Sequence, residues 1–446
     1  MAQNRGLGLT IKGLVVGGLI LLLLIPAMLV SNLIRERAER QQEVIDEVSS
    51  KWAEDQTILG PVLVIPYWSH ETDEIADAKT GVIRKIEKQV KRLCYVLPEE
   101  LRVDGELIPQ TRKRSIFKIT VYQAALDIRG KFAPVDFEEL DIKPEDLVAE
   151  QAQVCFGLSD FRGLEEQINV ELDGQSLKLI PNMVRNELIE TGLAANLKLD
   201  PKAGHDFSMK LNIRGSEQFY ITPVGARTDV TLRSTYANPS FIGNFLPNTP
   251  AGITEAGFTA EWSILNLNRS YPQSWKDDSQ SVYESYFGVE LLQPTDTYTK
   301  TTKAVKYALL FIALTFVLYF LLEILQKRNV HPMQYVLVGL ALCLFYTLLL
   351  SISEYTGFNW AYLIASAATI GLITWYSNTI FRKWSVAVLL AVGLALLYCF
   401  IFVLLQLQDG ALLFGSIGLF VLLAAIMYYS RKVDWQNEDA GEPDKQ

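Results

Sequence analysis

The most unusual chemical group in this sequence is a carboxylate inside an apolar run. Glu323 lies in the stretch Leu321-Leu322-Glu323-Ile324, within a segment long enough to cross a membrane. An ionisable side chain is costly to bury in lipid, so Glu323 is a candidate functional residue. Lys327 follows at i+4, in the favourable order for a helical ion pair, which favours a simple pair at the membrane surface. A proton or ion relay and a contact with a partner remain open.

Histidines give a weaker signal. The chain has three of them, at His70, His205 and His331. His70-Glu71 begins like a zinc-binding helix, but Glu74 occupies the position of the second histidine, so we predict no metal site. His331 precedes a proline in a short basic loop, which is typical of a turn that ends one helix and starts the next. A partner contact at His331 is the alternative, and we retain the residue as a functional candidate.

The cysteines allow one disulfide. Cys94 and Cys155 both lie in the polar part of the chain, whereas Cys343 and Cys399 lie in apolar runs. An oxidising compartment would permit a bond between Cys94 and Cys155. Two inert thiols in a folded core are the other reading, and the spacing does not decide between them.

Motifs for catalysis or cofactor binding are not evident. The sequence has neither a phosphate-binding Walker A pattern nor the G-x-S-x-G nucleophile motif. Neighbouring carboxylates such as Glu99-Glu100 point to opposite faces of a strand and so do not form an acid–base pair by themselves. We therefore predict that the chain is not an enzyme and holds no cofactor.

The elements that would position these residues come from two different materials. Hydrophobic residues make up 50% of the 446 residues and charged residues 20%. One polar stretch, Arg35–Ala304, holds 31 Lys and Arg against 42 Asp and Glu, a net formal charge of −11. That acidic balance argues against nucleic acid, whose phosphates need a basic surface. The composition indicates an integral membrane protein with one large water-exposed domain.

Six apolar segments are long enough to span a bilayer core, which takes about 20 residues of helix. They are Gly13–Ile34, Val305–Leu325, Gln334–Ser353, Phe358–Ser377, Ser385–Leu405 and Ala411–Ser430. The first is too long for a secretory signal and lacks its cleavage pattern, so we interpret it as an uncleaved anchor. The predicted fold is a six-span α-helical bundle with a β-rich domain inserted between spans 1 and 2. Its parts are residues 1–12, span 13–34, exposed domain 35–304, five-helix bundle 305–430 and tail 431–446.

Small residues in the first span suggest close helix packing. Gly13 and Gly17 form a G-x-x-x-G spacing, which lets helix backbones approach each other. We expect packing within the bundle, with association of two copies of the chain as the alternative.

Lys and Arg in the short loops predict the direction of insertion. Alternate connections are basic, through Lys327, Arg328, Arg382, Lys383, Arg431 and Lys432. Because cytoplasmic loops carry the excess of positive charge, both termini are expected in the cytoplasm and the large domain outside. Three arginines after the first span, Arg35, Arg37 and Arg40, oppose this assignment, but they belong to a long translocated domain, where the rule weakens.

The exposed domain shows mainly period-two patterning. After a polar helix over Arg35–Gln56, which continues the first span outward, apolar and polar residues alternate along Phe207–Arg214 and Ile168–Leu172. Asp173-Gly174 and Asp104-Gly105 each follow an alternating run, which predicts two hairpin turns. Short strands with turn signals favour β-sandwich or barrel-like subdomains, and the length allows two.

Several segments together resemble the CreD family of bacterial inner-membrane proteins. In the exposed domain they are Trp52, Gln56, Gly60-Pro61, Ile65-Pro66-Tyr67, the run Asn238–Pro247, Gly257-Phe258 and Ala260-Glu261-Trp262. In the apolar part they are Lys303–Phe316, His331–Phe345, Ser353-Glu354 and Gly357-Phe358. Each motif alone is weak, but together they are specific and cover nearly the whole chain. Glu354, within one of them, is a third functional candidate.

The resemblance implies a location in the inner membrane of a Gram-negative bacterium, with the large domain in the periplasm. It also implies expression under a two-component system and a role in tolerance of envelope stress, and it brings no known catalytic residue. Two functions follow as hypotheses. The domain binds an envelope protein, lipid or glycan and supports envelope integrity, or the helix bundle, with Glu323, Ser366 and Thr369, transports an ion or lipid.

Overall fold

The computed structural model describes residues 4–76, 83–181, 188–189, 192–200, 202–248, 252–277, 280–291, 297–326, 328–407 and 410–430. The chain forms two compact units. Met1–Gln42 and Thr295–Gln446 form the first, which we call the membrane unit, and Glu43–Pro294 form the second, the β unit. Lys327 and the tail 431–446 lie outside the described residues.

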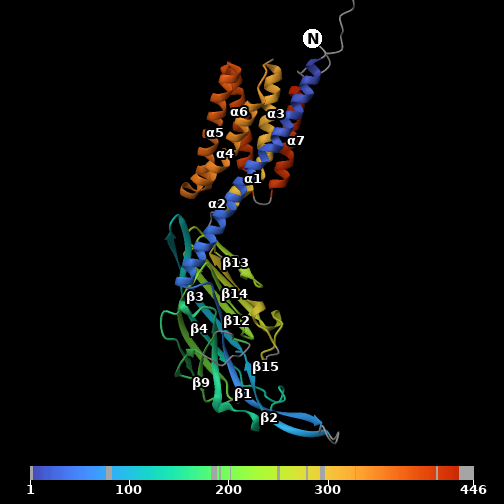
Figure 1. Ribbon diagram of the computed structural model, residues 1–446. Helices are drawn as coiled ribbons and strands as arrows, with labels where there is room; N and C mark the ends of the chain where they lie inside the picture. Colours follow the sequence, from blue (N-terminus) through green and yellow to red (C-terminus); the bar gives the residue numbers. More distant parts are fainter. Residues whose placement is uncertain are drawn as a thin grey trace, which may run out of the picture. The chain divides into compact units, whose positions relative to one another are not determined.

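The membrane unit is helical (Figure 1). Its helices are α1 (Asn4–Trp52), α2 (Thr297–Lys306), α3 (Ala308–Leu325), α4 (Pro332–Thr356), α5 (Phe358–Phe381), α6 (Trp384–Gln406) and α7 (Ala411–Ser430). Among the described residues, α1, α3, α4, α5 and α6 are long and apolar enough to cross a membrane. The described apolar part of α7, Leu413–Ala424, is shorter. The prediction of a membrane-spanning bundle is therefore confirmed for five of the six spans.

Two helices extend beyond the apolar segments that predicted them. The prediction that a polar helix continues the first span is confirmed, but α1 ends at Trp52, and Gln56, the predicted end, begins a strand. Before the second span, α2 buries Tyr298, Thr301 and Ala304. The membrane unit therefore resumes at Thr295, where we predicted the exposed domain to run to Ala304. Three lysines lower the mean hydropathy of α2, although one face of this helix is buried. A search for apolar runs therefore does not find α2.

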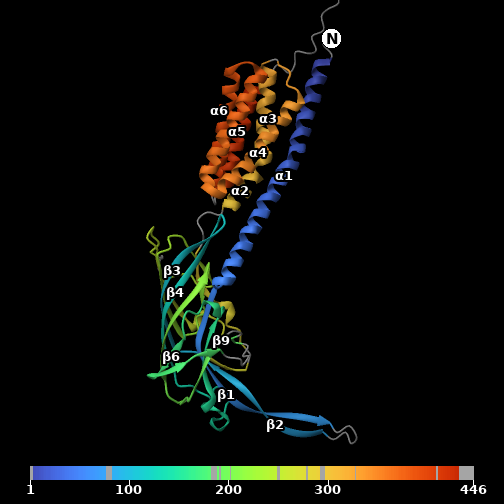
Figure 2. The same ribbon diagram turned by 60° about the vertical axis from the view of Figure 1, so that its left-hand side comes forward.

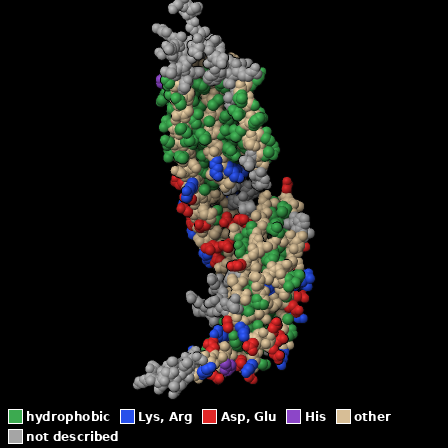
Figure 3. All heavy atoms as spheres, turned by 90° about the vertical axis from the view of Figure 1, so that its right-hand side faces the viewer, with side chains coloured by type: hydrophobic (Ala, Val, Ile, Leu, Met, Phe, Trp, Pro, Cys, Tyr) green, Lys and Arg blue, Asp and Glu red, His purple; other side chains and the backbone are tan. Residues whose placement is uncertain are grey.

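One face of α1 packs against the other helices. Val16, Leu23 and Ala27 are buried in the core of the membrane unit. Gly339 of α4 allows the close approach, because a Cβ there would lie 2.1 Å from a methyl group of Leu23. A Cβ at Gly13 or Gly17 would meet no atom within 4 Å among the described residues, so the prediction that this G-x-x-x-G packs within the bundle is wrong. The buried side chains of Val16, Leu23 and Ala27 make the contact instead. Hydrophobic side chains cover the outer face of this unit that Figure 3 shows.

The β unit contains two sheets. The first has the order β13-β16-β11-β1-β5-β9-β8, with β2 paired to β1 and β15 paired to β2. Its strands are β1 (Gln56–Ala76), β2 (Ile83–Val96), β5 (Ala152–Leu158), β8 (Ile180–Pro181), β9 (Gly192–Leu197), β11 (Gln218–Ile221), β13 (Pro239–Gly243), β15 (Ser274–Lys276) and β16 (Phe287–Leu291). The distal parts of β1 and β2 leave the sheet as a two-stranded ribbon (Figure 2).

The second sheet has the order β14-β12-β3-β4-β10-β6-β7. Its strands are β3 (Glu100–Arg114), β4 (Phe117–Phe132), β6 (Asn169–Leu172), β7 (Gln175–Lys178), β10 (His205–Ser216), β12 (Arg227–Ser234) and β14 (Phe258–Leu265). Short 3₁₀ turns connect strands of both sheets at Pro144–Asp146, Ala149–Gln151, Phe161–Gly163, Asn266–Asn268 and Tyr283–Ser285.

The two Asp-Gly pairs that predicted hairpins behave differently. Asp173-Gly174 forms the two-residue turn between β6 and β7, with φ of 50° and 80°. Asp104-Gly105 lies inside β3, so that prediction is wrong. A Cβ at Gly105 would lie 2.6 Å from Leu232 and 2.8 Å from Leu126, so the glycine makes room for leucines of the neighbouring strands.

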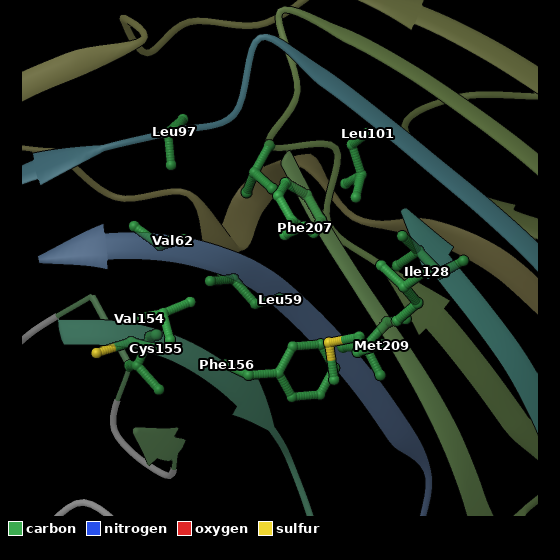
Figure 4. Packing of buried hydrophobic residues seen from close by; sticks show 14 of the residues in the cluster. Leu59, Val62, Leu97, Leu101, Ile128, Val154, Cys155, Phe156, Phe207 and Met209 are labelled. Atoms are coloured by element: carbon green, nitrogen blue, oxygen red, sulfur yellow. The ribbon is translucent and has the colours of Figure 1, made fainter. Parts of the chain in front are cut away.

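Both sheets contribute to one hydrophobic core. Leu59, Val62 and Phe156 come from the first sheet, and Ile128 and Met209 from the second (Figure 4). The length of the domain had allowed two β subdomains, but the side chains of the two sheets form a single cluster. The β unit is therefore a two-layer structure, with alternate residues of each strand facing the shared interior.

Candidate functional site

The carboxylate of Glu323 is buried and fully engaged. Its exposed fraction is 4%. The Tyr335 hydroxyl donates to Oε2 at 2.7 Å, and the backbone N–H of Val330 donates to Oε1 at 2.9 Å. The ammonium group of Lys12, from α1, pairs with the same Oε1. Glu323 thus forms an ion pair with Lys12, whereas the predicted partner Lys327 lies outside the described residues.

The turn between α3 and α4 builds this cluster. The backbone N–H of Met333 donates to His331 Nδ1 at 3.2 Å, and the backbone N–H of His331 donates to Gln334 Oε1 at 3.0 Å. These two bonds cap α4, and Pro332 occupies its first turn, where a missing N–H is harmless. The prediction that His331-Pro332 starts a helix is confirmed. The cap directs the N–H of Val330 towards Glu323.

An open pocket of about 340 Å³ lies beside the cluster. Ile11, Lys12 and Val15 of α1 line one side, and residues 329–332 line the other. It brings His331 and Lys12 to one surface, which the sequence alone did not predict. A contact with a partner at His331 stays a prediction.

Glu354 forms a second ion pair with α1. The Tyr298 hydroxyl donates to Glu354 Oε1 at 3.0 Å, and Nε of Arg37 lies 4.0 Å from the same oxygen. Lys12 and Arg37 are about 25 residues apart on α1, or about 38 Å along a helix. A bilayer core is about 30 Å thick, and about 40–45 Å with the headgroup regions, so this spacing suits one ion pair at each interface.

The interior of the helix bundle contains polar groups that the sequence reasoning missed. The hydroxyls of Tyr319 and Ser377 bond to each other, and the Tyr362 hydroxyl donates to the carbonyl oxygen of Tyr398 at 2.9 Å. Thr315 and Tyr346 have buried hydroxyls without a partner among the described residues. Ser366 and Thr369, named in the transport hypothesis, are also buried. Tyrosines spaced through the apolar runs are the signal that could have indicated this.

The candidate disulfide is not present. Cys94 and Cys155 are both free and buried. Cys94, on β2, pairs with Ile65 of β1, and Cys155, on β5, pairs with Val62 of β1. The strands β2 and β5 lie on opposite edges of β1. Two strand spacings alone separate their Cα atoms by about 10 Å, and the offset from Val62 to Ile65 along β1 adds to it, so the distance exceeds the roughly 7 Å limit for a disulfide. Desolvation by burial raises the pKa of each thiol to about 12, so both behave as inert core side chains.

We therefore expect four reactive thiols after denaturation of the unreduced protein. The four cysteines of the sequence would all be labelled by a maleimide, and prior reduction would not increase the labelling. Labelling of only two thiols, restored to four by reductant, would contradict the placement of Cys94 and Cys155. In the native state we expect labelling of these two to be slowed at least about 100-fold by burial.

His205 binds two acceptors in the β unit. Nδ1 lies 2.6 Å from Asp173 Oδ2, and Nε2 lies 2.9 Å from the carbonyl oxygen of Asp200. Only the imidazolium donates from both nitrogens. Burial alone lowers the pKa of His205, but the bonds to Asp173 and Asp200 outweigh it and raise that pKa above its ordinary value of 6.5. Burial likewise opposes ionisation of Asp173, but its bonds to His205 and Asp206 leave its pKa below 3.8.

This pair gives the β unit a pH-dependent stability. The raised pKa of His205 contributes stability that is present below pH 6.5 and lost as pH rises through the folded-state pKa. The lowered pKa of Asp173 contributes stability that is lost as pH falls below 3.8. Between pH 8 and pH 6 the free energy of unfolding of the parent chain should rise by less than about 1 kcal/mol because of His205. We expect His205→Asn to abolish this rise. Unfolding curves at both pH values would show it, and an equal gain in the variant would contradict it.

Trp52 is a further feature that the sequence analysis did not recognise as a site. It ends α1 beside the β3–β4 hairpin, where several basic side chains gather around its ring. In the sequence it was one of the residues that carry the family resemblance. Arginines far away in the chain supply the rest of this arrangement.

Comparison with known proteins supports one family for the whole chain. Residues 8–436 match the family described as "Inner membrane protein CreD". A relative of that name from Escherichia coli (strain K12) is 32% identical over 428 residues, which cover 94% of this chain and 92% of the relative. The apolar helices of the membrane unit agree with a protein of the inner membrane. The chain belongs to the CreD family of inner membrane proteins.

Proposed function

We propose that this chain supports the integrity of the cell envelope and its tolerance of stress through its β unit. In this proposal the β unit lies in the periplasm and binds an envelope protein, lipid or glycan, without catalysing a reaction. The observation that carries the proposal is the size of the β unit, which takes up more than half of the chain and forms its own core. Expression of the whole chain would be controlled by a two-component regulatory system.

The direction of insertion belongs to the same proposal. Arg328 lies between α3 and α4, and Arg382 and Lys383 lie between α5 and α6. Basic connections of this kind favour the cytoplasmic side, so both termini would be cytoplasmic. Alkaline phosphatase inserted after Gly174 should be active and a fluorescent protein after Gln446 should fluoresce. The opposite pattern would place the β unit in the cytoplasm and end the proposal.

Photocrosslinking on the full chain tests the binding role. A photoreactive residue would replace exposed positions of the β unit, such as Trp68 on β1 or Leu267 in the turn after β14. Trp375 on α5, exposed on the membrane unit, is the matched control. A protein, lipid or glycan product that recurs from the β unit and not from Trp375 supports binding. The absence of a recurring product at every exposed position of the β unit would contradict binding.

Transport remains the second candidate because of the buried polar groups. Glu323, Tyr319 and Ser377 lie inside the membrane unit, where polar side chains are costly unless they serve function or pairing. Proteoliposomes with an internal pH dye would be given an ion gradient. A proton flux that Glu323→Gln abolishes would favour transport, and no flux from the intact chain would eliminate proton movement and proton-coupled ion transport.

A further inference from the structure

We propose that the basic pocket around Trp52 in the β unit is a binding site for a phosphate group. The inference rests on the proposed binding role of the β unit and names the chemistry of the component. The pocket has a volume of about 220 Å³. Its lining includes Lys51, Arg112, Lys113 and Arg114, with Glu47 as its one carboxylate.

The Trp52 ring holds two arginines in place. Cζ of Arg112 lies 4.5 Å from the ring centre and Cζ of Arg214 lies 4.7 Å from it. Trp52 belongs to α1, Arg112 to β3 and Arg214 to β10, so three elements meet at this ring. Stacking uses the flat face of a guanidinium and leaves its N–H edge available for an anion. The ring thus orders cations that would otherwise be mobile on the surface.

The charges around the pocket are only partly compensated. Glu47 receives both Lys51, at 2.7 Å, and Arg114, at 3.1 Å. Glu165 pairs with Arg214 at 2.5 Å. Within the part of the chain that the structure describes, Arg112 and Lys113 have no carboxylate partner.

Such a positive excess stands out because Arg35–Ala304 carries a net charge of −11. Like charges gathered this closely repel each other, and an anion among them would remove the repulsion. A phosphate group matches the arrangement, since its oxygens accept from a guanidinium fork and from an ammonium at the same time. A phospholipid headgroup and a free phosphate share this chemistry.

A purely structural role predicts a different pattern of effects. If Trp52 and the arginines served only to attach α1 to the strands, the exposed ammonium of Lys113 would contribute nothing. A phosphate site needs Lys113, because it is one of the two cations without a carboxylate partner. Lys113→Gln leaves the stack on Trp52 intact and so separates the two roles.

The test uses the full chain in nanodiscs of phosphatidylcholine, which has no net charge. Calorimetric titration would use inorganic phosphate and dihexanoyl phosphatidylglycerol as probes, with dihexanoyl phosphatidylcholine as the zwitterionic control. We expect a phosphate-bearing anion to bind, and to bind more weakly as salt rises. Binding of inorganic phosphate would show that a free phosphate suffices. Binding of dihexanoyl phosphatidylglycerol without binding of inorganic phosphate would identify a lipid headgroup as the ligand.

Two variants in the pocket, and a control pair that removes as many charges as the double variant, decide the location. The affinity for the probe should fall in Lys113→Gln and in Arg112→Gln/Lys113→Gln. In the double variant it should fall by at least about tenfold. The control Lys178→Gln/Lys198→Gln removes two exposed lysines of the β unit away from the pocket. No binding of either probe to the intact chain, or an equal loss in the control pair, would overturn the inference. The broader binding role would survive that result if the photocrosslinked products of the β unit persisted.

Discussion

Glu323→Leu is expected to lower the free energy of unfolding of the membrane unit by about 3 kcal/mol or more. The change leaves the N–H of Val330 and the hydroxyl of Tyr335 without an acceptor, and each buried orphan costs about 1–3 kcal/mol. It also leaves Lys12 beside an apolar surface without its counter-ion. Unfolding of the full chain in mixed detergent micelles, followed by helical circular dichroism, would measure the loss.

Two further variants separate the parts of this cluster. Glu323→Gln keeps an oxygen that accepts a hydrogen bond, so we expect roughly half the loss of the leucine variant. Lys12→Met and Glu323→Leu combined should cost less than the sum of the two single changes, because each removes the same ion pair. Strict additivity within about 0.3 kcal/mol would show that the two side chains do not interact.

The same variants bear on the choice between the two functions. If the cluster only positions α1, survival of the host under envelope stress should follow the stability of the variants. If Glu323 carries a proton or ion, Glu323→Gln should abolish survival while much of the stability remains. The two hypotheses therefore predict different ratios of stability loss to functional loss for one conservative substitution.

The sequence predicted the elements of this protein better than it predicted their contacts. Runs of apolar residues identified five spans, and alternation identified strands such as β10, because these patterns repeat within the element itself. The pairing of Glu323 with Lys12 crosses 311 residues. The local i+4 rule could propose only Lys327, which lies outside the described residues, since it compares neighbours on one helix.

Two predictions were wrong for a related reason. Asp104-Gly105 has the composition of a turn, yet the glycine serves leucines from β4 and β12 that come close only in the folded sheet. Cys94 and Cys155 are both buried, but the strand β1 lies between them and sets their separation. The cations around Trp52 come from β3 and β10, so no window along the chain contains them together. Sequence patterns report on local geometry, and these three features depend on sheet order.

Trp262→Ala is expected to cost the β unit about 4 kcal/mol, within the range for a large buried aromatic residue. Trp262 has an exposed fraction of 2% on β14, the edge strand of the second sheet. Its ring lies 5.7 Å from that of Phe241 and 5.3 Å from that of Phe287, both in the first sheet. Its indole N–H donates to the carbonyl oxygen of Phe245 at 3.1 Å. The alanine variant loses this bond and leaves a cavity between the sheets.

The control variants identify what the ring contributes. Trp262→Phe keeps most of the packing and removes the N–H, so we expect a loss of about 1–2 kcal/mol. Trp68→Ala, at an exposed tryptophan of β1, should change stability by no more than about 0.5 kcal/mol. Pulse proteolysis in urea on the full chain would compare all three with the parent. Equal stabilities of the two alanine variants would mean that Trp262 does not join the sheets. Within its own sheet, β14 is an edge strand that pairs with β12. A large loss at Trp262 alone would therefore show that the stability of the β unit depends on contacts between its two sheets.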